Sequence, residues 1–217
     1  QGISVAQAYK DAGAGLNAAP LKDLFAAKKA AGKAATVAMT FPGGTHDLWI
    51  RYWLAAGGID PDKDVETITV PPPQMVANMK VGTMDAFCVG EPWPGQTVNQ
   101  KIGYTAVTTG EIWAKHPEKS LGMRAAWVDK YPKAAQAILM AVMEAQQWAD
   151  KAENKKELAT IMGKRQWINC PVEDVYDRSA GKFDYGIPGK VVEDSPHIMK
   201  YWRDHASYPF QSHDLWF

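Results

Sequence analysis

A glycine turn at residues 41–47 brings together the residue types best suited to hold a small anion. Phe41-Pro42-Gly43-Gly44 ends a short β-type run, and Thr45 is a natural N-cap for a following helix. The first amides of a helix lack partners within it and carry partial positive charge, so they attract anions. His46 falls in the first turn, where its ring can add a donor. A plain strand-to-helix connection with an exposed histidine is the alternative, and Asp47 could satisfy the helix end itself.

Two later segments could contribute to the same site. Gly90 follows an apolar run and would let the backbone approach a ligand closely. Ligands of open α/β sheets bind beyond the carboxyl ends of strands, where both glycine segments fall. Trp93 in the same segment has the alternative role of packing between lobes. Lys119, in the run His-Pro-Glu-Lys, is either a solvated charge or a cation of the site.

The sequence gives little support to catalysis. It contains no Gly-x-Ser-x-Gly elbow, P-loop or dinucleotide fingerprint. Glu91 and Glu118 resemble an acid/base pair, but nothing in the sequence places them on one substrate. Cys88 lies in an apolar run, the usual setting of an inert thiol, and Cys88 and Cys170 fit no metal or redox spacing. We therefore predict a binding protein without catalytic residues, cofactor or metal.

Composition argues against two further kinds of protein, nucleic-acid binders and proteins with membrane-spanning helices. The chain has 217 residues, 46% of them hydrophobic and 22% charged, with 24 basic and 24 acidic side chains. This zero formal charge lacks the basic footprint of a nucleic-acid binder, so we expect no nucleic-acid partner. No apolar run approaches the roughly 18 residues that a membrane-spanning helix needs.

The elements that would position these residues alternate between strand and helix in the first half. Strands are predicted at 35–41, 65–70 and 86–89, and helices at 21–31, 47–56 and 74–81. Such alternation is typical of an α/β fold with parallel βαβ units. After residue 122 we predict a short strand at 123–128, a long helix from Pro132, and helices at 155–162, 172–180 and 196–205. The change in pattern indicates two lobes with a crossover near 121–127.

Longer runs resemble a known family. Residues 40–60 read TFPGGTHDLWIRYWLAAGGID, residues 70–80 VPPPQMVANMK, and residues 87–93 FCVGEPW. The runs HPEK at 116–119 and NCPVE at 169–173 follow in the same order. Over nearly its whole length, the chain resembles the nitrate- and bicarbonate-binding solute receptors of bacterial ABC importers.

This resemblance implies a two-lobed, type II periplasmic-binding-protein fold with a discontinuous first lobe. Residues 1–34 would end the first lobe and approach the hinge, and residues 35–121 would form the second, α/β lobe. Residues 122–217 would return, mostly as helices, to the first lobe, whose N-terminal part is expected to be missing from this chain. The anion contacts carried over by position are His46, Gly90, Lys119 and Gln1.

Lys119 is expected to decide the ligand. Nitrate accepts hydrogen bonds and donates none, so a pocket of donors leaves none of its atoms unmatched. Bicarbonate carries an O–H and needs an acceptor; its receptors in the family place a carboxylate at this position and recruit calcium. An unmatched buried polar group costs about 1–3 kcal/mol. Lysine therefore favours nitrate, with nitrite as a second ligand.

The resemblance also implies partners and a location. We expect a periplasmic receptor that delivers its anion to the permease and ATPase subunits of an ABC importer. It would be tied to the inner membrane by a lipid anchor outside this chain. The alternatives are a regulatory domain fused to the importer ATPase, a cytoplasmic nitrate sensor, and a bicarbonate-binding paralogue. Enzymes of the same fold need a reactive cysteine, which Cys88 does not resemble.

Overall fold

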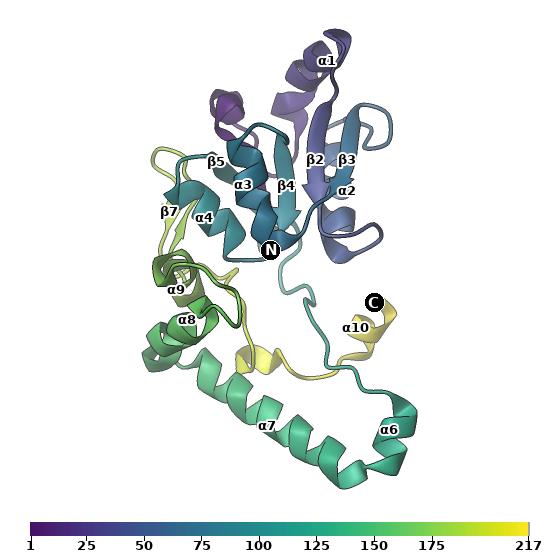
Figure 1. Ribbon diagram of the computed structural model, residues 1–217, viewed down its shortest axis with the longest axis vertical. Coiled ribbons are helices and arrows are strands. Elements are labelled where there is room, and N and C mark those ends of the chain that lie inside the picture. Colours follow the sequence, from purple (N-terminus) through teal and green to yellow (C-terminus); the bar gives the residue numbers. More distant parts are fainter. Residues whose placement is uncertain (217) are drawn as a thin grey trace.

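A five-stranded mixed sheet forms the centre of the computed structural model, which describes residues 1–216 (Figure 1). In spatial order the strands are β3 (Val65–Thr69), β2 (Ala35–Met39), β4 (Ala86–Val89), β1 (Gly2–Ala6) and β5 (Gly103–Thr108). Strand β2 is parallel to β3 and β4, whereas β1 is antiparallel to both β4 and β5. The carboxyl ends of β2, β4 and β5 therefore lie at the same edge of the sheet as the start of β1.

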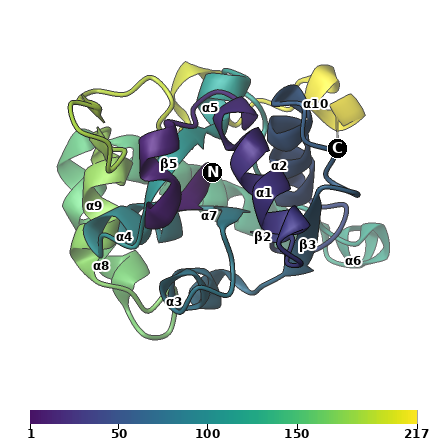
Figure 2. The same ribbon diagram turned by 90° about the horizontal axis from the view of Figure 1, so that it is seen from above.

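Helices cover both faces of this sheet, because its strands are apolar on both sides (Figure 2). They are α1 (Lys22–Ala30) and α2 (Thr45–Ala56) on one face, and α3 (Met75–Lys80) and α4 (Trp93–Asn99) on the other. Successive strand residues point to opposite faces: Val37 packs into the cluster of α1 and α2, and Ala38 into that of α3 and α4. This double cover fixes the strand ends rigidly.

The second half of the chain is mostly helical. It contains α6 (Ala125–Lys130), α7 (Pro132–Asp150), α8 (Lys155–Gly163), α9 (Val172–Ala180) and α10 (Gln211–Trp216). Helices α8 and α9 share a small core, and α9 lies against α4 of the sheet unit. Helix α7 runs apart from the sheet (Figure 1), and of its 19 residues only Ala135 and Ala149 are buried. No helix within residues 1–216 is long and apolar enough to cross a membrane.

Short elements complete the structure. They are α5 (Thr109–Ile112), the hairpin of β6 (Phe183–Asp184) and β7 (Val191–Val192), and 3-10 turns at Gln7–Ala12, Ala19–Leu21, Pro72–Gln74, Ala152–Asn154 and Arg203–His205. The start of the hairpin joins the sheet unit, because the amide of Thr105 donates to the carbonyl of Tyr185 at 2.9 Å.

Most predicted elements are confirmed to within two residues, but two predictions are wrong. The strand expected at 123–128 is helix α6, since a short apolar run suits either structure and no strand lies beside it to pair with. The helix expected at 196–205 is irregular except for the turn Arg203–His205. There Asp150 Oδ2 accepts the amides of residues 201, 202 and 203, so these donors are not available to a helix.

The expected boundary at residue 34 does not divide the sheet. Strand β1 is an interior strand between β4 and β5, and α1 covers the same face as α2. Residues 1–34 therefore pack in one unit with β2 to β5. The sheet is also mixed. The parallel βαβ units predicted from residue 35 onward are joined by β1, which is antiparallel to its two neighbours, β4 and β5.

Candidate anion-binding site

The edge at which β2, β4 and β5 end gathers the predicted anion contacts. Gln1 precedes β1, His46 lies in the first turn of α2 after β2, and Gly90 directly follows β4. The sheet register pairs Gly2 with Val89 on one side and with Thr108 on the other. This pairing brings Gln1 to the level of Gly90, and the Gln1 carbonyl accepts the amide of Thr109 at 3.1 Å.

His46 presents a neutral ring to this edge. Its Nδ1 lies 2.9 Å from the Thr40 hydroxyl, and burial lowers the pKa of His46 to about 4, although the charge of Glu118 opposes the shift. When the Thr40 hydroxyl donates to Nδ1, the ring carries its proton on Nε2; in the other tautomer Nε2 is an acceptor. Among the described residues, that Nε2 is buried without a hydrogen-bond partner. A buried, unpaired N–H is a donor available to a ligand.

The glycine turn before α2 is fixed by Asp47 rather than by Thr45. The helix begins at Thr45 with Gly44 as its N-cap, and no side chain caps its first amides. Asp47 is buried and accepts the Gly43 amide at 2.9 Å and Arg51 Nε at 2.8 Å. Gly43 has φ 75°, a left-handed conformation that favours glycine. The expectation of Thr45 as N-cap is therefore wrong, and Asp47 holds the turn without occupying the helix end.

Gln1 links the strand edge to the segment after α5. Its Nε2 donates to Thr45 Oγ1 at 3.2 Å and to the carboxylate of Glu118. The same carboxylate accepts Lys119 Nζ. Gln1 Oε1 is buried and has no partner among residues 1–216. Two predicted anion contacts, Gln1 and Lys119, therefore meet at Glu118, which from the sequence alone resembles only one half of an acid/base pair with Glu91.

Lys119 itself is exposed, whereas its neighbour Glu118 is only partly exposed. The Lys119 side chain is 74% exposed and that of Glu118 is 14% exposed. Burial disfavours the charged form of Glu118, but hydrogen bonds from Lys119 and Gln1 together with nearby positive charge outweigh it and lower the pKa of that carboxyl. The site in this structure therefore holds an acceptor, and the donor-only pocket expected from the sequence is not what the residues form.

The segment that carries Glu118 is anchored by His116. Both ring nitrogens of His116 are bonded, Nδ1 to the Pro117 carbonyl and Nε2 to the Thr109 hydroxyl, each at 2.8 Å. The ring packs against Trp49 of α2, with the two ring centroids 4.8 Å apart. Residues 116–119 are thus fixed to both α2 and the end of β5.

The segment after β4 is held from the helical half. Arg178 of α9 is buried and donates to Glu91 Oε1 at 2.6 Å and to Thr105 Oγ1 at 2.8 Å. Glu91 therefore has no free role as an acid/base partner of Glu118. Gly90 faces open space, because an added Cβ would meet nothing within 4 Å. Trp93 is buried in the sheet core, which favours its packing role.

No reactive or metal-binding group joins the site among residues 1–216. Cys88 is buried and unpaired, and burial raises the pKa of its thiol to about 12, so it stays protonated at neutral pH. The described residues contain no group of three or more His, Cys, Asp or Glu side chains that could hold a metal.

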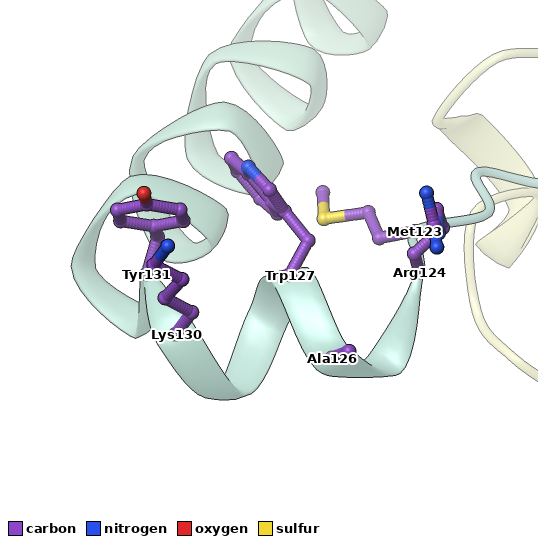
Figure 3. Close-up of a pocket in the computed structure, with 6 residues that line it drawn as sticks. All are labelled: Met123, Arg124, Ala126, Trp127, Lys130 and Tyr131. Carbon is purple, nitrogen blue, oxygen red and sulfur yellow. The ribbon is translucent and has the colours of Figure 1, made fainter.

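A separate hollow lies on α6, in the helical half. It has a volume of about 590 Å³ and is lined by Met123, Arg124, Ala126, Trp127, Lys130 and Tyr131. Figure 3 shows Trp127 and Tyr131 on the same side of the helix, and their ring centroids are 5.8 Å apart. It shares no residue with the predicted anion contacts.

Comparison with known proteins places this geometry in context. The model of the NMT1-like family matches residues 1–163. A nitrate/nitrite binding protein, NrtA, of Synechocystis sp. is 61% identical over 217 residues, which are 100% of this chain and 48% of the relative. A bicarbonate-binding protein, CmpA, of Synechococcus elongatus is 43% identical over 220 residues, or 100% of this chain and 49% of the relative.

The crystal structure of the periplasmic nitrate-binding protein NrtA from Synechocystis matches with a TM-score of 0.92 and 60% identity, over 99% of this chain and 55% of that one. The predicted periplasmic-binding-protein fold is therefore confirmed. The chain spans about half the length of the curated relatives it matches.

Proposed function

The chain belongs to the NMT1-like family, and we propose that it forms the anion-binding part of a periplasmic receptor for nitrate, with nitrite as a second ligand. The identity to a nitrate/nitrite binding protein is 61%, against 43% to a bicarbonate-binding one, and this difference supports the ligand. The observation that carries the proposal is His46 Nε2, a buried ring nitrogen without a hydrogen-bond partner among the described residues at the carboxyl edge of the sheet.

The anion would lie between the start of α2, the start of β1 and the end of β4. His46 Nε2 and the uncapped amides of α2 would donate to it, and the open space at Gly90 would let it approach the backbone. Gln1 Nε2 and Lys119 Nζ can reach the same anion only if they leave Glu118. Once Glu118 has left these donors, the groups that face the anion all donate, and this set suits nitrate because nitrate only accepts.

Residues 122–217 would complete a first lobe together with a further part of the full-length receptor. Helix α7 supports this arrangement, because Ile138, Leu139 and Met140 are 44%, 46% and 53% exposed. Exposed apolar surface of this extent is typical of a face that another element covers. The aromatic hollow on α6 continues the same helical segment.

The receptor would deliver its anion to the permease and ATPase subunits of an ABC importer, and would catalyse no reaction. A lipid anchor outside residues 1–217 would hold it at the inner membrane. The buried, protonated thiol of Cys88 supports a binding role over an enzymatic one.

Calorimetric titration of the full-length protein with nitrate, nitrite, and bicarbonate with and without calcium tests the function. We expect wild type to bind nitrate tightly and to ignore bicarbonate. Lys119→Glu should weaken nitrate binding about tenfold or more, since it replaces a donor by a second carboxylate beside the anion. Lys63→Glu, a charge reversal at a side chain that is 80% exposed and far from this edge, is the matched control.

Two results would contradict the proposal in different ways. Tight binding of bicarbonate by wild type would overturn the ligand. Unchanged nitrate affinity in Lys119→Glu would exclude Lys119 from the site and leave the ligand in place.

A further inference from the structure

We infer that Glu118 is a specificity-determining residue that occupies two donors of the anion site, Gln1 Nε2 and Lys119 Nζ, and must release Gln1 before a ligand can use both Gln1 and His46. This inference rests on the proposed function, because it concerns how the same site selects its anion.

The geometry of the carboxylate supports competition. Oε2 accepts Gln1 Nε2 and Oε1 accepts Lys119 Nζ, so each oxygen uses one of the predicted anion contacts. A carboxylate is a planar group with two acceptor oxygens, and nitrate presents two of its three oxygens in the same way. Glu118 therefore holds these donors as a bound oxyanion would.

Other carboxylates near this edge are committed elsewhere. Asp47 accepts Gly43 and Arg51, Glu91 accepts Arg178, and Glu111 accepts Thr108 and Tyr185. None of these bonds uses a predicted anion contact. Glu118 is thus the carboxylate, among those described here, whose partners are the donors of the site.

Burial makes the competition effective. The Glu118 side chain is 14% exposed, and its pKa is lowered, so it is charged at neutral pH. The titratable groups that face it are His46, His116 and Lys119. Two negative charges a few ångströms apart in a partly buried site repel each other strongly. A ligand must therefore displace Glu118 from Gln1, and a dianion is repelled about twice as strongly as a monoanion.

Two nitrogen atoms, His46 Nε2 and Gln1 Nε2, would bind the anion one after the other. His46 Nε2 is unpaired among the described residues and can take an anion before Glu118 moves. Once Glu118 turns away, Gln1 Nε2 is free to join His46 on the ligand, while Lys119, which is 74% exposed, can follow either carboxylate or anion. The charge of Glu118 therefore lowers the affinity of the site for both nitrate and sulfate, and it lowers the affinity for the dianion sulfate more.

Glu118→Gln in the full-length protein tests this role. The substitution keeps the shape and one acceptor but removes the charge. Titrations at neutral pH with nitrate and with sulfate should show nitrate binding about tenfold tighter than in wild type, and sulfate binding that wild type lacks. Glu118→Ala should likewise tighten the binding of both nitrate and sulfate. Glu66→Gln, which neutralises an exposed side chain of β3, should change neither.

The outcomes separate the hypotheses. Weaker nitrate binding in Glu118→Gln would show that Glu118 positions the donors, and unchanged affinity for both anions would place it outside the site; either result overturns competition. Tighter nitrate binding without any gain in sulfate binding would overturn the selection against dianions. If neither wild type nor the variants bind nitrate, the proposed function itself fails.

Discussion

The two edges of the central sheet treat buried polar groups in opposite ways. At the edge where β2 and β4 begin, Asp85 is buried and its carboxylate is fully used. It accepts the Tyr9 hydroxyl at 2.7 Å, the Thr36 amide at 2.7 Å, and Lys28 Nζ at 2.5 and 2.6 Å from its two oxygens. These bonds join the 3-10 turn after β1, helix α1 and strand β2.

At the edge where the same strands end, polar atoms are left over. His46 Nε2 and Gln1 Oε1 are buried without partners among residues 1–216. Gln1 Nε2 donates to Glu118 and Thr45, and Lys119 Nζ donates to Glu118. An unpaired buried polar atom costs free energy unless something else satisfies it. The comparison teaches that one edge of the sheet uses its polar groups within the fold, whereas the other leaves polar atoms unpaired among the described residues, as the proposed anion site requires.

Removing the Asp85 carboxylate, whose hydrogen bonds hold the edge where β2 and β4 begin, should give the largest effect on stability. In Asp85→Ala the Thr36 amide, the Tyr9 hydroxyl and the Lys28 ammonium lose a shared buried acceptor. We expect the free energy of unfolding of the full-length protein to fall by about 3–5 kcal/mol. Urea denaturation without nitrate measures it, and nitrate affinity of the folded variant should equal that of wild type.

An exposed carboxylate provides the control for that variant. Asp62, whose side chain is 73% exposed, pairs with Arg51 at the surface, so Asp62→Ala should change the free energy of unfolding by less than about 1 kcal/mol. Equal losses in the two variants would refute the special role of the Asp85 edge.

The sequence predicts the strand-ending edge better than the strand-starting one. Glycine turns after β2 and β4 are local signals, and the resemblance to a receptor family supplied His46, Gly90, Lys119 and Gln1. Asp85 has no such signal, because its partners lie up to 76 residues away and depend on the complete fold. For the same reason β1 was not predicted, since five residues gain their strand identity only from β4 and β5.

Glu118 illustrates a different limit. The residue stands beside Lys119 in the sequence, yet only the fold shows that the glutamate side chain is 14% exposed and the lysine side chain 74% exposed. Which of the two side chains turns inward depends on His116, because its hydrogen bonds to Thr109 and to the Pro117 carbonyl fix the backbone of this segment. No spacing rule on a single segment could supply that orientation.

Removing the unpaired His46 Nε2 at the other edge should have a smaller effect, and on nitrate affinity rather than on stability. His46→Asn keeps a group beside the Thr40 hydroxyl and deletes Nε2, which has no partner among the described residues. We expect nitrate affinity to fall about tenfold while the free energy of unfolding changes by less than about 1 kcal/mol. Calorimetry and urea denaturation of the same preparation measure both.

His205→Asn is the control for this variant, because His205 is exposed and its φ of 61° is a conformation that asparagine tolerates. A large loss of stability with unchanged affinity in His46→Asn would mean that this edge is built like the Asp85 edge.

A further expected effect is a dependence of stability on pH. Because burial lowers the pKa of His46 to about 4 from its usual 6.5, the unfolded chain binds a proton that the folded chain rejects between these values. The stability contributed by the neutral ring is complete above pH 6.5 and is lost progressively as the pH falls towards 4. Urea midpoints at pH 7.5 and 5 should therefore differ more for wild type than for His46→Asn. His116, whose pKa is also lowered by burial, is present in both proteins and cancels in this difference. Equal pH dependence in the two proteins would show that the His46 ring is solvated, and the contrast between the edges would then rest on Gln1 alone.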